Sequence, residues 1–130
     1  MPHNEKLTIV FNSDVGVDDA LAHLLILSQT KSNPDITIPG VVATVGNAIL
    51  GQTALNVRRI LELVEQKNIK VYRGALTPLG LEKNVTEVDQ AINKTHFYGR
   101  DGLADQPPQS WPAAILYIAV SNLPESSELP

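Results

Sequence analysis

The sequence lacks cysteine altogether and is poor in aromatic and in positively charged residues. Its 130 residues include no Cys, one Trp and 5% aromatic residues, with 10 Lys and Arg against 14 Asp and Glu. Without cysteine the chain has neither a disulfide framework nor thiolate ligands for a metal. The net charge of −4 gives no basic surface of the kind that attracts nucleic acid, so we expect no nucleic-acid partner.

Long hydrophobic runs are also missing, although 43% of the residues are hydrophobic. No apolar run reaches the ~18 residues that span a bilayer, and the opening stretch MPHNEKL lacks the apolar core of a signal peptide. We therefore expect no membrane partner and a cytoplasmic location. The length and the ordinary content of charged residues are typical of one globular domain, so residues 1–130 are interpreted as a single domain.

Strand-like and helix-like segments alternate along the first 74 residues. β-branched and apolar runs predict strands, and long apolar stretches with helical spacing predict helices. The expected segments, in order, are strand 7–13, a helix from Val17 to about Ser32, strand 36–44, helix 50–66 and strand 69–74. This order predicts an α/β fold with a doubly wound, mostly parallel sheet. Strand 7–13 is apolar on both faces, so we expect it at the centre of the sheet.

The remaining residues are less regular. Residues 75–110 show no clear periodicity and are interpreted as a long loop, and a further helix is expected over 111–120 with Ser110 as its N-cap. His23 lies within the apolar stretch of the first helix and is interpreted as a structural rather than a catalytic residue.

Three carboxylates stand at the end of the first expected strand, in the stretch FNSDVGVDDA. Ligands of α/β sheets bind at the carboxyl ends of strands, where Asp14 lies. Asp18 and Asp19 could simply complement the dipole of the following helix, but capping leaves Asp14 unexplained. Asp14 and Asp19 can converge across the turn, and their repulsion then raises a pKa or demands a cation, for which carboxylate oxygens suit Ca²⁺ or Mg²⁺.

The stretch NSDVGVDDALAHLLIL resembles the N-terminal motif of the nucleoside hydrolases, the inosine-uridine-preferring N-ribohydrolases. The pattern of that family is Asp-x-Asp-Pro-Gly-x-Asp-Asp-Ala after a strand. The resemblance continues, in order, through VVATVGNAILGQTALNVRRILEL, VYRGALTPL and FYGRDGLAD, so that it covers nearly the whole chain.

The resemblance implies Ca²⁺-dependent hydrolysis of the N-glycosidic bond of ribonucleosides to ribose and free base, through an oxocarbenium-like transition state. It implies that Asp14 binds Ca²⁺ and activates the attacking water. Asp19 falls on the aspartate that binds the same ion. Asp18 falls on the residue that hydrogen-bonds ribose hydroxyls, and Asn47 on the asparagine that borders the ribose.

The chain departs from the family pattern at three positions. Asn12 replaces the first aspartate, which removes a negative charge next to the metal site, and Val15 replaces the proline of the turn. Tyr98 replaces the loop histidine, and the nearby His96 is a second candidate for that role. His96 and Tyr98 are therefore candidates for a loop on the base side of the substrate.

Length is the largest departure, because members of this family are much longer chains whose second half supplies further metal ligands and a histidine beside the base. We expect the chain to be a nucleoside hydrolase-like domain truncated on its C-terminal side, a poor catalyst alone and a homo-oligomer. A non-catalytic metal- or ribose-binding paralogue and a Mg²⁺-dependent phosphohydrolase remain alternatives, and the preferred base stays open.

Overall fold

The computed structural model describes residues 5–80, 82–105 and 124–130. The strands are β1 Leu7–Thr8, β2 Phe11–Ser13, β3 Ile36–Thr37, β4 Gly40–Ala43 and β5 Lys70–Arg73. The helices are α1 Val17–Ser32, α2 Leu50–Leu63 and α3 Val85–Thr95, followed by the 3₁₀ turn η3 Ser126–Glu128. The helix expected over 111–120 lies outside the described residues.

All the strand pairs are parallel, as the alternation of strands and helices predicts. One sheet has the order β2-β4-β5, with Phe11 opposite Val41 and Val41 opposite Val71. A two-stranded extension pairs β1 with β3. Parallel strands connected by helices confirm the predicted α/β fold.

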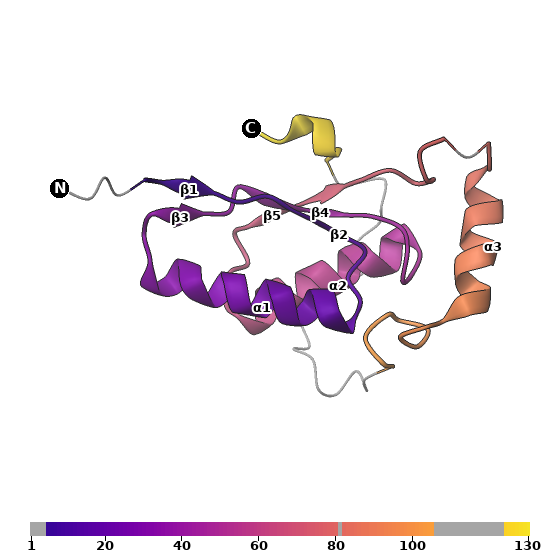
Figure 1. Cartoon of the computed structure of the whole chain (residues 1–130), viewed down its shortest axis with the longest axis horizontal. Helices are drawn as coiled ribbons and strands as arrows, with labels where there is room; N and C mark the ends of the chain where they lie inside the picture. The colour runs from indigo at the N-terminus through magenta and orange to yellow at the C-terminus, as the bar shows by residue number, and fades with distance from the viewer. Residues whose placement is uncertain (1–4, 81, 106–123) are drawn as a thin grey trace.

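The two long helices α1 and α2 lie on the same face of the sheet, and η3 lies on the other face beside β5 (Figure 1). Successive right-handed crossovers that step in one direction across a sheet place their helices on one side. In the described part of the chain, the face opposite α1 and α2 is therefore covered only by the short segment around η3. We call this the open face of the sheet.

The core lies between α2 and the two strands β4 and β5. Every residue of β4 is buried, and α2 contributes the side chains that the helical spacing predicts, namely Val57, Ile60 and Leu61. These three side chains have the i, i+3, i+4 spacing of one helix face. Because α2 packs on the centre of the sheet, the turn that precedes it is held firmly at the carboxyl end of β4.

The first predicted strand differs from the observed structure in two ways. It is divided into β1 and β2, because Ile9 and Val10 lie outside both strands. The expectation that it is central is wrong for the described residues, since β2 is the outer strand and β4 the central one. Its apolar composition was misleading, because Leu7 and Val10 are 52% and 45% exposed.

Two further segments also differ from their predictions. The strand expected over 36–44 is divided into β3 and β4 at Ile38 and Pro39, where proline has no N–H to donate to a neighbouring strand. The loop expected over 75–110 contains α3, of whose residues only Val88 is buried. The start of α3 could have been predicted from the sequence, because Asn84 and Glu87 have the spacing of a reciprocal capping box, which the structure contains.

Candidate functional site

The turn between β2 and α1 places Asp14, Asp18 and Asp19 at the carboxyl end of the sheet. Asp14 follows β2 directly, and the other two lie in the first turn of α1. The N–H of Gly16, the N-cap residue, donates to Asp19 Oδ2 at 3.2 Å. Asp19 therefore serves the helix terminus as the capping interpretation predicts, while its carboxylate stays beside Asp14.

Asp14 is held by the turn after β4. The backbone N–H of Asn47 donates to Asp14 Oδ2 at 2.9 Å. A Cβ atom at Gly46 would lie 2.0 Å from the same oxygen, so only glycine allows the backbone to approach the carboxylate this closely. The position of Asp14 thus depends on a turn more than thirty residues away in the sequence.

The carboxyl groups of Asp14 and Asp19 converge. Burial raises the pKa of Asp19, and the neighbouring Asp14 carboxyl raises it further through a hydrogen bond and through its charge. The charge of Asp18 acts in the same direction, while the bond from Gly16 opposes the increase. Two carboxyl groups in this arrangement can share one proton or one cation.

Tyr98 lies over this turn from a distant loop. A Cβ atom at Gly16 would lie 2.8 and 2.9 Å from two carbons of the Tyr98 ring and 2.5 Å from Asn47 Nδ2, so both side chains rest on that glycine. Burial raises the pKa of Tyr98, and the charge of Asp18 and a hydrogen bond to it raise the pKa further. The hydroxyl of Tyr98 therefore faces the carboxylates.

Ser13 and His23 support the turn from the side of α1. His23 is 2% exposed, its Nε2 lies 3.2 Å from Ser13 Oγ, and its ring centroid lies 4.6 Å from that of Phe11. The same Ser13 oxygen accepts the N–H of Val15 at 3.4 Å, so it connects the residues on both sides of Asp14. Burial lowers the pKa of His23 to about 4, which keeps the ring neutral at pH 7.

The structure brings together five of the six residues that the sequence singles out: Asp14, Asp18, Asp19, Asn47 and Tyr98. His96 ends α3 in a left-handed backbone conformation (φ 42°), and its side chain takes no part in the contacts described above. Gly46 and Ser13 were not identified from the sequence, whereas the interpretation of His23 as a structural residue agrees with its burial and its contact with Ser13. The pattern Ser-Asp at a strand end was visible, but its pairing with a histidine ten residues later depends on how α1 packs.

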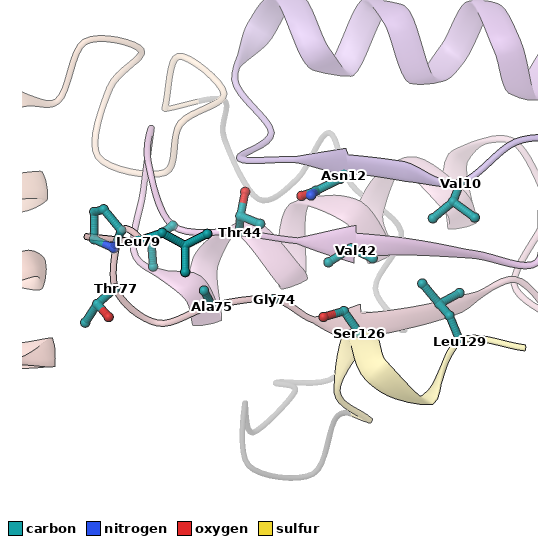
Figure 2. Close-up of a pocket in the computed structure, with 12 residues that line it drawn as sticks. Val10, Asn12, Val42, Thr44, Gly74, Ala75, Thr77, Leu79, Ser126 and Leu129 are labelled. Carbon is teal, nitrogen blue, oxygen red and sulfur yellow. The ribbon is translucent and has the colours of Figure 1, made fainter. Parts of the chain in front are cut away.

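Asn12 lies apart from these contacts, on the open face of the sheet. Side chains alternate along a strand, so Phe11 and Ser13 face His23 while Asn12 faces the opposite side. There it lines a groove of about 600 Å³ together with Thr44, Leu79 and Leu129 (Figure 2). The groove is mostly apolar and carries none of the three carboxylates.

A complete metal site does not emerge from the described residues alone. Within residues 5–80, 82–105 and 124–130, no group of three or more His, Cys, Asp or Glu side chains is arranged to hold a metal ion. Asp14 and Asp19 could supply part of an all-oxygen coordination sphere. In the same part of the chain, none of the helices has the length and apolar character needed to cross a membrane.

Known proteins share both the sequence and the fold of this chain. Residues 9–128 match the model of the inosine-uridine preferring nucleoside hydrolase family. The pyrimidine-specific ribonucleoside hydrolase RihA of Salmonella schwarzengrund is 31% identical over 124 residues, which cover 94% of this chain and 37% of that protein. RihA of Shewanella sp. strain ANA-3 is 34% identical over 107 residues, which cover 82% of this chain and 31% of that protein.

Two solved structures have a similar fold. A plant nucleoside hydrolase, the PpNRh1 enzyme, superimposes with a TM-score of 0.60 at 23% identity, over 82% of this chain and 30% of the other. A purine-preferring ribonucleoside hydrolase from Gardnerella vaginalis gives 0.61 at 24% identity, over 81% and 30%. The chain spans about a third of the length of these curated relatives. The family match over residues 9–128, together with the carboxylate turn that its motif predicts, shows that this chain belongs to the inosine-uridine preferring nucleoside hydrolase family.

Proposed function

We propose that this chain provides the carboxylate side of a site that hydrolyses the N-glycosidic bond of ribonucleosides to ribose and free base. The observation that carries the proposal is the convergence of Asp14 and Asp19 at the end of β2, where burial and the neighbouring Asp14 carboxyl together raise the pKa of Asp19. A perturbed carboxyl group such as that of Asp19 is typical of functional sites, and membership of the nucleoside hydrolase family supports the proposed reaction class.

The residues around the turn have separate roles in this proposal. Asp14, held by the N–H of Asn47, accepts the proton of the attacking water. Asp18 is exposed beside it and accepts hydrogen bonds from the ribose hydroxyls, with the Asn47 side chain at the border of the sugar. Charge that develops on the ribose ring as the bond to the base breaks is stabilised by the nearby carboxylates.

We further propose that the cation is Ca²⁺, held by Asp14 and Asp19. The donor set is all oxygen, and the raised pKa of Asp19 supports the need for a positive charge between the two carboxyl groups. When bound, the ion lowers the pKa of a coordinated water and orients the sugar diol. Two carboxylates provide only part of the usual six to eight oxygen ligands, so we expect weak affinity.

Calcium binding is tested by calorimetric titration of the wild type and Asp19→Ala. We expect the heat of binding to be lost in Asp19→Ala, because one of the two converging carboxylates is gone. The matched control is Asp35→Ala, which removes the same charge from the start of β3, at the other end of the strands. Equal heats for wild type and Asp19→Ala would exclude the metal assignment.

A non-catalytic role in binding a metal ion or ribose is the second candidate. One observation favours it: within the described residues, no group of three or more potential metal ligands is arranged to hold an ion. Positioning of reactants can lower a barrier by roughly 7–11 kcal/mol, and a site that holds the sugar from one side forgoes much of that.

Release of ribose from uridine and inosine at saturating Ca²⁺ separates the two candidates. Uridine is the first substrate to test, because the RihA relatives are named as pyrimidine-specific. We expect turnover of residues 1–130 well below the ~1–10³ s⁻¹ of ordinary enzymes. Turnover within that range would show that the site is complete in this chain, and binding without any release of ribose would favour the non-catalytic role.

We also propose that the protein is cytoplasmic and forms homo-oligomers. The absence of cysteine supports the first point. The exposed apolar side chains Val10 and Leu79 on the open face, 45% and 95% exposed, support the second, because water-exposed apolar surface favours association. Sedimentation velocity of the purified chain measures the oligomeric state, and a strictly monomeric chain contradicts the proposal.

A further inference from the structure

The loop of residues 96–105 reaches the carboxylate turn and is fixed there by α2 and by the core. Buried Asn56 of α2 donates its side-chain N–H to the Asp101 carbonyl oxygen at 2.6 Å. Leu103 is 6% exposed within the hydrophobic core, and Gly102 lies against the carbonyl oxygen of Val15. The loop is therefore docked on the turn rather than projecting into solvent.

The interior of the loop is also tied together by its own side chains. Asp105 Oδ1 accepts the backbone N–H groups of Arg100 and Asp101, and Asp101 Oδ1 accepts those of Leu103 and Asp105. The N–H of Ala104 donates to the carbonyl oxygen of Tyr98 at 2.8 Å. These bonds fix the backbone from which the Tyr98 side chain extends.

Tyr98 and its neighbour Phe97 differ sharply in environment. Phe97 is 79% exposed and meets the Tyr98 ring edge-on, with the centroids 4.8 Å apart. Tyr98 is half-buried, its ring rests on Gly16, and its hydroxyl reaches the Asp18 carboxylate. The charges that act on that hydroxyl are all negative, from Asp18, Asp19 and Asp14, so the phenol serves them as a hydrogen-bond donor.

We propose that Tyr98 is a positioning residue on the sugar side of the nucleoside site, where its hydroxyl holds the Asp18 carboxylate in the orientation that receives the ribose hydroxyls. This places Tyr98 beside the sugar rather than beside the base, and the inference rests on the proposed function of Asp18. A carboxylate has about four lone-pair positions, so Asp18 can accept the phenol hydroxyl and a ribose hydroxyl together. Holding Asp18 in one rotamer in the free protein lowers the entropy that substrate binding must remove.

The role predicts that Tyr98 acts through Asp18 and not through the metal ligands. Tyr98→Phe removes only the hydroxyl and keeps the ring on Gly16. We expect inosine and uridine to bind about fivefold more weakly to Tyr98→Phe, while Ca²⁺ affinity stays at the wild-type value. A hydrogen bond to a charged group has a larger effect when buried, and the exposure of Asp18 reduces it here.

The test is a double-mutant cycle of Tyr98→Phe and Asp18→Asn, with nucleoside and Ca²⁺ affinities measured by calorimetry. In the Asp18→Asn background, Tyr98→Phe should weaken nucleoside binding no further. Tyr72→Phe is the matched control, because it removes a hydroxyl from a buried tyrosine on β5, and it should change neither affinity. Equal losses in both backgrounds, or a parallel fall in Ca²⁺ affinity, would overturn the positioning role.

Nuclear magnetic resonance of labelled tyrosine rings tests the contact without substrate. The chain has three tyrosines, and Tyr98→Phe identifies the signal of Tyr98. We expect Asp18→Asn to shift that signal and to leave the signal of Tyr72 in place. A Tyr98 signal unchanged by Asp18→Asn overturns the contact. If that signal shifts but the wild type binds neither nucleoside, the proposed function fails and the contact stands.

Discussion

The turn of residues 13–19 and the loop of residues 96–105 meet at one site but are built in different ways. The turn is short and lies between two regular elements, β2 and α1. The loop connects to no described strand, and its position depends on Asn56 and Leu103, which lock it onto α2 and the core. The comparison shows that one side of the site is fixed by local chain geometry and the other by tertiary contacts.

The backbone of the two segments shows the same contrast. The turn has one residue with positive φ, Val15 at 35°, and the side chain of Val15 is completely buried. The loop has five such residues, of which only two are glycines: His96, Gly99, Gly102, Ala104 and Asp105. Left-handed conformations are unfavourable for residues other than glycine, so the loop needs its side-chain hydrogen bonds to keep its shape.

The largest expected effect is a loss of stability at low pH, which follows from protonation of His23 beside the turn. Burial lowers the pKa of His23 from 6.5 to about 4, so the unfolded state binds a proton that the folded state excludes between these values. The stability that neutral His23 contributes is complete above pH 6.5 and is lost as the pH falls towards 4, by about 3 kcal/mol. Urea unfolding of wild type and His23→Gln from pH 7 to 4 measures the difference in slope.

His96→Gln is the control for this experiment, because it removes a histidine from the loop rather than from the turn. It should keep the loss of stability between pH 6.5 and 4 that the burial of neutral His23 produces. If His23→Gln keeps it as well, the burial of neutral His23 is not what couples folding to protonation.

The second prediction concerns Asn56→Ala, which should loosen the loop and leave the turn intact. Asn56→Ala leaves the carbonyl oxygen of Asp101 without its buried donor, which we expect to cost about 2 kcal/mol. Hydrogen exchange of the Ala104 amide should accelerate, while that of Ala20 in the first turn of α1 should not change. Gln52→Ala is the control, because Gln52 bonds Asn56 but not the loop, and comparable acceleration in both variants would contradict the prediction.

The smallest expected effect belongs to the hydroxyl of Ser13. Ser13→Ala removes the contact to His23 and the acceptor for the N–H of Val15, at a cost of about 1 kcal/mol. A thermal or urea melt at pH 7 measures the loss. Ser28→Ala removes an exposed hydroxyl that bonds only its own helix, and the prediction is wrong if that change costs as much.

The structural features predicted best from the sequence are those that depend on residues close together along the chain. The alternation of strands and helices, the extent of α1 and the buried face of α2 follow from apolar periodicity within single segments. The proximity of Asp14 and Asp19 follows from the short turn that separates them. Each of these features is set within about twenty residues.

Features that depend on distant segments were predicted poorly. The place of β2 at the outside of the described sheet depends on which strands pair, and apolar composition does not specify this. The position of Tyr98 beside Asp18 depends on a hydrogen bond between Asn56 and Asp101, 45 residues apart. A single sequence contains no local signal for such a contact.

The register of the sheet has a consequence for how this chain folds. Phe11 is the register partner of Val41, and Val41 is the register partner of Val71. Each parallel pairing therefore closes a loop of the same length. The entropy lost on closing a loop grows only slowly with its length, so the two β-α-β units should form at similar rates. The segment carrying Tyr98 has no surface to dock on until α2 is in place, and we expect it to order last. The contact between Tyr98 and Asp18 would then form after the carboxylate turn is in place.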